Sequence, residues 1–400
     1  MTPPTLALFD GLPAFPEPLH VGRPNLGDRA RLMERIEGAL DRKWLSNNGP
    51  LALELEARLA EDLGVRHAFA VCNATVGLEV ALRAAELTGE VIVPSYTFVA
   101  TAHAVQWLGL TPVFADVDPL THVLDPASVE AAVTPRTSAI LGVHVWGQPC
   151  PVDALQAIAD RHGLRLMFDA AHAYGCTLGG TPIGGFGDAE VFSFHATKFV
   201  NSFEGGAITT NDDALAERVR LMRNFGFAGT DLVVCEGTNA KMTEVCAAMG
   251  LTSLESLGDI VAVNRRNYHI FRDGLAGLAG VRFFEYDERE ANNFQYVVLE
   301  VDEAEAGISR DDVVRALTLE NVLARRYFAP GVHRMEPYAT LQPDAGATLP
   351  VTRALVDKSM LLPTGTAVGP DDARTIVALV RAILAEPARV RAALAEPVAA

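Results

Sequence analysis

The segment from Leu164 to Asp212 constrains the fold most, because it alternates short apolar runs with turns that carry charged residues. Its first apolar run, Leu164–Phe168, has the length of a buried strand and stops at Asp169. A second run, Ala189–Phe194, leads within a few residues to Lys198. Ligands of open α/β sheets bind at the carboxyl ends of the strands, so Asp169 and Lys198 are expected to face one crevice.

An acid and a lysine that converge across glycine-rich turns suggest pyridoxal 5′-phosphate (PLP) as cofactor. The lysine can condense with the cofactor aldehyde, and the carboxylate can hold the pyridine nitrogen protonated because an opposite charge favours the charged form. A lone lysine after a strand is usually solvated, and a lone aspartate there is usually a helix cap. Taken together, Lys198 and Asp169 are the candidate catalytic residues.

The rest of the chain predicts an α/β protein, because strands and helices alternate from about residue 67 onward. Beyond about residue 256 the pattern changes, with predicted strands at 294–301 and 322–328 and a last helix at 371–384. We therefore expect a large domain with a mostly parallel mixed sheet and a smaller C-terminal α/β domain. The expected divisions are an N-terminal arm (1–25), a large PLP-binding domain (26–255), a small domain (256–390) and a disordered tail (391–400).

Charge and cysteine content restrict the partners. The formal net charge of −17, from 33 basic and 50 acidic residues, disfavours nucleic acid and anionic membranes as partners. The five cysteines include no CxxC pair and no Cys/His metal spacing, so we expect no metal site and a reducing compartment. With no signal peptide or long apolar run expected, the predicted location is the cytoplasm.

Three motifs in sequence order, FDAAHAYG, GDAEVFSFHATK and EGGAITTND, resemble the DegT/StrS family of PLP-dependent sugar aminotransferases. The resemblance runs from about Leu19 through the final helix. NATVGL, GTNAKMTE and RRYFAPGVH are most similar to members that aminate C4 of dTDP-4-keto-6-deoxyglucose, as in the desosamine pathway. The resemblance implies the aspartate-aminotransferase type I fold, L-glutamate as donor, pyridoxamine 5′-phosphate as the intermediate cofactor form, and a homodimer with shared active sites.

The family pattern implies roles for individual residues around the cofactor. Lys198 would bind the aldehyde and Asp169 the pyridine nitrogen, while His172 would approach the ring hydroxyl. Phe98 would stack on the pyridine face. A further set matches the phosphate-binding positions, the last of them reaching over from the partner subunit: Ala74, Thr75, Ser193 and Asn239.

The sugar-nucleotide contacts are implied less specifically. Arg325, Arg326, Tyr327 and His333 follow a predicted strand of the small domain and are candidates to face the diphosphate or sugar. Lys241 stands where many members have arginine, so it is a candidate marker of a substrate subgroup. His195 is assigned no chemical step.

Several functions stay open at this level. The enzyme alternatives are amination at C3 of a 3-keto sugar, amination of another nucleotide sugar such as a GDP-linked one, and dehydration by an enzyme of the same fold. Known dehydratases of the family replace the lysine, so Lys198 argues against the last of these. A non-catalytic ligand-binding or regulatory protein is a different class, against which intact Asp169, Ser193 and Lys198 argue.

Overall fold

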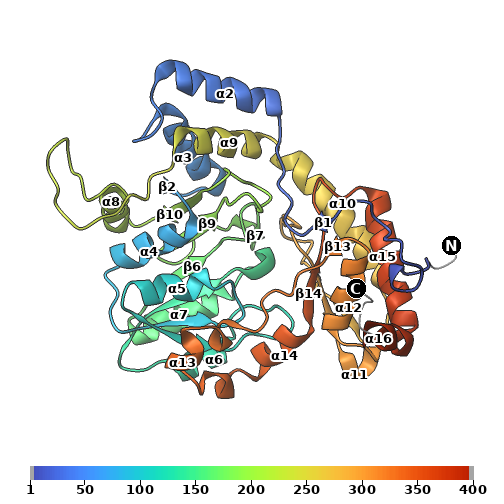
Figure 1. Cartoon of the computed structure of the whole chain (residues 1–400). Helices are drawn as coiled ribbons and strands as arrows, with labels where there is room; N and C mark the ends of the chain where they lie inside the picture. Colours follow the sequence, from blue (N-terminus) through green and yellow to red (C-terminus); the bar gives the residue numbers. More distant parts are fainter. Residues whose placement is uncertain (1–3, 396–400) are drawn as a thin grey trace.

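Seven strands form one twisted sheet at the centre of the larger half of the molecule (Figure 1). In spatial order they are β2 (His67–Val71), β10 (Gly206–Thr210), β9 (Ala189–Ser193), β6 (Arg165–Asp169), β5 (Thr137–Val143), β3 (Glu90–Pro94) and β4 (Thr111–Ala115). The pairs β3–β4, β3–β5, β5–β6 and β6–β9 are parallel, and β10 runs antiparallel to both β2 and β9. The carboxyl ends of the parallel strands therefore meet the start of β10 at one edge. This computed structural model describes residues 4–395.

Helices cover both faces of this sheet, which explains why its strands are almost wholly apolar. All five residues of β3 are buried, for example. Asp28 caps the first long helix of this half through the N–H groups of Ala30 and Arg31. The helices are α2 (Arg29–Arg42), α3 (Pro50–Leu63), α4 (Ala74–Ala84), α5 (Ala100–Trp107), α6 (Pro126–Ala132), α7 (Val152–His162), α8 (Asp213–Met222) and α9 (Glu244–Glu255). A short hairpin joins β7 (Thr177–Leu178) to β8 (Thr181–Pro182). The α/β class and mostly parallel mixed sheet are confirmed.

A smaller α/β unit lies beside the large one (Figure 1). Its antiparallel sheet has the order β11 (Val281–Phe283), β12 (Val297–Val301) and β14 (Ser359–Leu362). Its helices are α10 (Leu257–Leu275), α11 (Glu303–Ala306), α12 (Arg310–Leu319), α15 (Pro370–Ala385) and α16 (Pro387–Ala395). No single helix in residues 4–395 has both the length and the apolarity to cross a membrane. Only α9 and α10 together meet these criteria, across a 61° bend.

The N-terminal arm packs on the small unit. It contains α1 (Ala7–Asp10) and β1 (Leu19–His20), and β1 pairs in parallel with β13 (Val322–Leu323). Leu6 and Phe15 are buried in the core that β12 and β14 share.

The structure differs from the sequence-based expectation at four places in the C-terminal part. The strand expected at 322–328 is limited to the two residues of β13, and the strand expected at 294–301 begins at Val297. Residues 391–395, expected to be disordered, complete α16, because Val390 and Leu394 bury their side chains in the small core. Residues 396–400 lie outside the described part of the chain.

The fourth difference concerns the expected domain division at residue 256. Residues 332–352 return to the large domain and include α13 (Tyr338–Leu341) and the start of α14 (Pro350–Lys358). The N–H of Val332 donates to the carbonyl of Ser95 over 3.0 Å. Tyr338 is fully buried, with its ring 5.5 Å from that of Phe114 in β4. Local patterning could not reveal this return, because only tertiary packing distinguishes it from a small-domain segment.

Candidate active site

Asp169 is the last residue of β6 and lies buried at the edge where the strands end. Its Oδ2 accepts a 2.8 Å hydrogen bond from the Oγ1 of Thr101 in α5, and its Oδ1 accepts a 3.1 Å bond from the N–H of Ala171. Burial raises the pKa of the Asp169 carboxyl, while these two bonds act in the opposite direction. A cationic ligand group at this carboxylate would restore its charged form, as expected for the partner of a protonated ring nitrogen.

Lys198 lies in the turn that follows β9, where its N–H donates to the carbonyl of His195 over 2.8 Å. Its Nζ is 3.2 Å from the phenolic oxygen of Tyr296, a buried residue just before β12. Burial lowers the pKa of Lys198 to about 8, although the charge of Asp169 opposes this change. A substantial fraction of Lys198 is therefore a neutral amine near pH 8, the form able to condense with an aldehyde and to accept protons.

His172 is held as a neutral ring. The N–H of Trp146 donates to its Nδ1 over 3.1 Å, so the ring proton of neutral His172 is on Nε2. Burial, with the charge of Lys198 adding to it, brings the pKa of His172 well below its usual value. The ring centre lies 4.6 Å from that of Tyr296, the hydrogen-bond partner of Lys198. His172 thus belongs to the same site and has one hydrogen-bond donor to offer a ligand.

The expected phosphate-binding residues come together at the start of α4. Ala74 and Thr75 open this helix, whose first N–H groups favour anions. The strand register aligns Val71, Gly206 and Ser193 across the sheet, so Ser193 and the helix start share one edge. A Cβ at Gly206 would lie 2.9 Å from the backbone nitrogen of Ala74 and 2.6 Å from the carbonyl oxygen of Phe192. Glycine is required there for β10 to approach α4 so closely.

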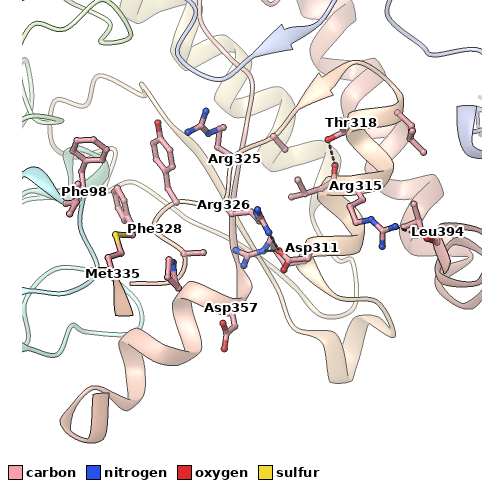
Figure 2. Close-up of a pocket in the computed structure, with 18 of the residues that line it drawn as sticks. Phe98, Asp311, Arg315, Thr318, Arg325, Arg326, Phe328, Met335, Asp357 and Leu394 are labelled. Carbon is pink, nitrogen blue, oxygen red and sulfur yellow. Dashed lines mark hydrogen bonds and ion pairs between the residues drawn. The ribbon is translucent and has the colours of Figure 1, made fainter. Parts of the chain in front are cut away.

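A cavity of about 1430 Å³ lies next to this site. Phe98, whose side chain is 59% exposed, lines it together with Arg326 and Tyr327. In Figure 2, Phe98 and Met335 lie at one end, Arg315 and Leu394 at the other, and Arg325 and Arg326 between them. Arg326 forms a 3.4 Å ion pair with Asp311 of α12, and the Arg325 guanidinium lies 5.4 Å over the Tyr327 ring. The cavity therefore offers a large aromatic surface and four arginines, Arg325 and Arg326 at its centre and Arg310 and Arg315 on the side of α12.

Asn239 and Lys241 lie beside the start of α4 of their own chain. Lys241 Nζ donates to Asn239 Oδ1 over 2.6 Å, and the intervening Ala240 accepts a 2.7 Å bond from the N–H of Cys72. Asn239 is exposed. The segment that contains it is thus anchored two residues before the helix that begins at Ala74.

Two histidines have other partners. His333 is 5% exposed, its Nδ1 lies 2.7 Å from Ser95 Oγ, and it does not line the cavity. The structure thus separates it from Arg326 and Tyr327. His195 is exposed and its Nδ1 bonds Thr197 Oγ1 over 2.8 Å, which adds no chemical role.

Sequence reasoning missed three residues of the site: Thr101, Trp146 and Tyr296. Each belongs to a segment with no polar signature of its own, and each reaches the site only through the fold. Thr101 lies at the start of α5 and Trp146 lies shortly after β5, positions that could have indicated them, whereas Tyr296 directly precedes β12 and carries no such signal.

PLP fits these residues. The exposed Phe98 ring, the Asp169 carboxylate, the low-pKa amine of Lys198 and the glycine-lined start of α4 supply its stacking, nitrogen, aldehyde and phosphate partners. When bound, the cofactor supplies an electron sink for a carbanion next to nitrogen. Within residues 4–395, no group of three or more His, Cys, Asp or Glu side chains is arranged to hold a metal ion.

The fold and this set of groups define a PLP-dependent enzyme of the aspartate-aminotransferase type. More particularly, the chain belongs to the DegT/DnrJ/EryC1/StrS aminotransferase family, whose family model matches residues 27–381. It is 37% identical over 349 residues to dTDP-4-amino-4,6-dideoxy-D-glucose transaminase of Escherichia coli, covering 86% of this chain and 93% of that protein. GDP-perosamine synthase of Caulobacter vibrioides is 35% identical over 92% of this chain and 98% of its own length. The crystal structure of DesI in the presence of its TDP-sugar product superimposes with a TM-score of 0.93, at 54% identity over 98% of this chain and 99% of DesI.

Proposed function

We propose that this aminotransferase moves the amino group of L-glutamate to C4 of dTDP-4-keto-6-deoxyglucose, giving dTDP-4-amino-4,6-dideoxyglucose for natural-product glycosylation. The observation that carries the proposal is the 54% identity to DesI over nearly the whole chain, with the lysine and aspartate of the site in place. Nucleotide sugars and free glutamate are cytoplasmic metabolites, so the proposal includes a cytoplasmic location.

The side chains divide the work of the reaction. Asp169, fixed by Thr101, stabilises positive charge on the ring nitrogen of the cofactor. Lys198 Nζ, with its pKa near 8, would move a proton between the carbon that bears the amino group and the cofactor, in one direction with glutamate and in the reverse direction with the keto sugar. Neutral His172 would donate a hydrogen bond from Nε2. Because it carries no positive charge, it would not compete with the protonated ring nitrogen for the electrons of the carbanion.

The cavity beside Phe98 is the proposed site for the nucleotide-linked sugar. Arg325 and Arg326 line it, and guanidinium groups bind diphosphate oxygens well because of their charge and planar donors. Arg326 is currently paired with Asp311 at 3.4 Å, an exposed contact that a diphosphate can replace at little cost. The aromatic ring of Tyr327 adds an apolar wall.

A homodimer with shared sites is part of the proposal. The loop between α8 and α9 (residues 223–243) projects from the large domain (Figure 1). Leu232, Val233 and Val234 are 58%, 56% and 53% exposed there, an unusual apolar run for a solvated loop. Burial of this run against a second copy would bring Asn239 and Lys241, further along the same loop, to the subunit boundary.

The direct test uses purified holoenzyme, L-glutamate and a panel of keto sugars: dTDP-4-keto-6-deoxyglucose, its 3-keto isomer and a GDP-linked 4-keto sugar. We expect one amine product, from the dTDP-4-keto sugar, identified by mass and NMR. Preference for the GDP sugar, as the name of the Caulobacter relative suggests for that protein, would replace the nucleotide assignment. Lack of turnover with every donor and acceptor, in a protein that binds PLP, would favour a non-catalytic role.

A further inference from the structure

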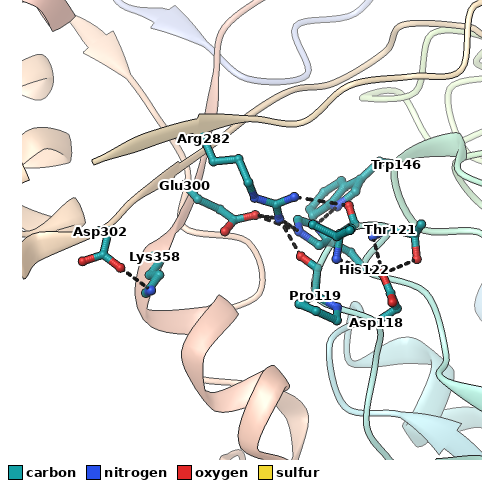
Figure 3. Close-up of polar contacts among 10 residues, drawn as sticks. Asp118, Pro119, Thr121, His122, Trp146, Arg282, Glu300, Asp302 and Lys358 are labelled. Atoms are coloured by element: carbon teal, nitrogen blue, oxygen red, sulfur yellow. Dashed lines mark hydrogen bonds and ion pairs between the residues drawn. The ribbon is translucent and has the colours of Figure 1, made fainter. Parts of the chain in front are cut away.

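Three residues far apart in the sequence form a chain of contacts that leads from the small domain to His172. Glu300 of β12 accepts a 2.9 Å hydrogen bond from His122 Nε2, and Trp146 Nε1 donates to His122 Nδ1 over 3.0 Å. The N–H of the same Trp146 donates to His172 Nδ1 over 3.1 Å. His122 follows β4 of the large domain, so the chain of contacts crosses between the two halves of the molecule (Figure 3).

The protonation of His122 follows from its partners. An indole N–H can only donate, so Nδ1 of His122 must accept, and the ring proton lies on Nε2, directed to Glu300. Arg282 of β11 lies 2.8 Å from the same Nε2 but donates to Glu300 and, over 2.7 Å, to the carbonyl of Pro119. His122 is 1% exposed and Trp146 is fully buried, so loss of any of these bonds would leave a polar group without water.

Trp146 links this network to both parts of the candidate site. Its ring stacks on that of His172 at 5.8 Å and 17°, and on that of Phe328 at 5.0 Å and 12°. Phe328 lines the large cavity, whereas His172 belongs to the cofactor site. Trp146 also has a φ of 63°, a backbone conformation that a bulky residue adopts only when its surroundings hold it there.

We propose that His122 is a positioning residue that, by fixing the Trp146 indole against Glu300 and Arg282 of the small domain, holds His172 in its cofactor-binding orientation and tautomer. His122 itself contacts neither cofactor nor substrate. Its hydrogen bonds act on the site through Trp146, and their loss should alter the cofactor site before it alters the fold.

Two substitutions at His122 separate positioning from packing. His122→Phe keeps a ring of similar size between Tyr96 and Phe284 but removes both hydrogen bonds. His122→Gln keeps an acceptor for Trp146 and a donor for Glu300. Lys358→Met is the matched control, because it breaks the nearby 2.5 Å pair with Asp302, which does not contact His122 (Figure 3).

The first measurement is the dissociation constant of PLP from the purified protein, which does not depend on the sugar substrate. We expect His122→Phe to raise it about tenfold, the effect of one lost buried hydrogen bond, and to shift the absorbance band of bound PLP. His122→Gln should restore both properties, and Lys358→Met should change neither. Equal PLP affinity and an unchanged band in folded His122→Phe protein would overturn the proposal.

The second measurement follows Trp146 in cofactor-free protein. The other two tryptophans, Trp44 and Trp107, are exposed and can be replaced by phenylalanine, which leaves Trp146 as the single tryptophan. In this background His122→Phe should shift the emission to shorter wavelength, because the indole N–H loses its partner, and His122→Gln should reverse the shift. An emission spectrum that is unchanged by substitutions at His122 would also contradict the proposed positioning role, whatever sugar the enzyme uses.

Discussion

Thr101 Oγ1 donates to Asp169 Oδ2 over 2.8 Å while itself lying 3.0 Å from Thr97 Oγ1, so the carboxylate opposite the cofactor ring is fixed by α5. Without this donor, the buried carboxyl would lose one of the two bonds that favour its charged form. With PLP bound as we propose, the charge on Asp169 would retain a proton on the ring nitrogen. Thr101 would therefore favour the protonated ring nitrogen indirectly, by keeping Asp169 charged.

Thr101→Val removes the hydroxyl at nearly constant volume and should slow both half-reactions about tenfold, consistent with the loss of one hydrogen bond to a charged group. The first half-reaction is measured as the single-turnover rate with glutamate. The second is measured as the single-turnover rate with a keto sugar, after the enzyme has been treated with glutamate. Thr101→Ser keeps the donor and should retain near-normal rates. If the Val and Ser variants react equally fast, the hydroxyl does not support Asp169.

Lys198→Ala and Lys198→Arg should both abolish turnover, because alanine removes the amine that condenses with the aldehyde and arginine remains protonated. The fold should persist, since a half-buried lysine in the site adds little packing. Circular dichroism and turnover with glutamate and keto sugar check the two statements. Wild-type turnover in the Ala variant would show that another group performs the proton transfer.

The pH dependence of PLP uptake tests the depressed pKa of Lys198. Only the neutral amine condenses with the aldehyde, so uptake by cofactor-free protein should become faster as pH rises, with a midpoint near the folded pKa of about 8. An ordinary lysine would place the midpoint near 10.5. Because Asp169 raises this pKa, Asp169→Asn should move the midpoint to lower pH, and an unmoved midpoint would indicate that the two groups do not interact.

Gly206→Ala should weaken PLP retention, because its new Cβ would lie 2.9 Å from the backbone nitrogen of Ala74 and push the start of α4 away from β10. Gly258→Ala is the control, since a Cβ there meets nothing within 4 Å. Equilibrium dialysis of PLP compares the two. Unchanged retention in Gly206→Ala would mean that the helix start can shift without losing its anion site.

The sequence alone predicts those residues of the site that lie at the ends of recognisable strands. Asp169 ends one strand and Lys198 follows the next one in the same segment, so the geometry of a parallel sheet predicts that they face one crevice. Thr101 and Tyr296 reach the same place from segments whose patterns indicate only a helix or a strand. His333 shows the opposite failure: its motif suggested a substrate contact, but the return of the chain to Ser95 buries it.

The position of Asn239 yields the sharpest prediction about assembly. The segment that carries it is anchored beside α4 of its own chain, whereas the family resemblance implies that Asn239 serves the site of the partner subunit. Asn239→Ala should weaken PLP retention about tenfold or more in either arrangement, because an amide donor to a charged phosphate is worth about 1.5–3 kcal/mol. Retention in the homodimer alone cannot distinguish the two arrangements.

Mixed dimers distinguish them. Lys198→Ala chains combined with Asn239→Ala chains give heterodimers in which the distribution of the two defects between the two sites depends on which subunit Asn239 serves. If Asn239 serves the partner, one site carries both defects and the other carries neither, so the heterodimer regains one active site with normal PLP affinity. If Asn239 serves its own chain, every site carries one defect, and activity at limiting PLP equals the plain average of the two parent homodimers. A third outcome, in which Asn239→Ala lowers thermal stability without changing PLP retention, would leave Asn239 with a structural role in the loop it shares with Lys241. We expect the first result, because the exposed Leu232–Val234 run of the same loop needs a second chain to cover it.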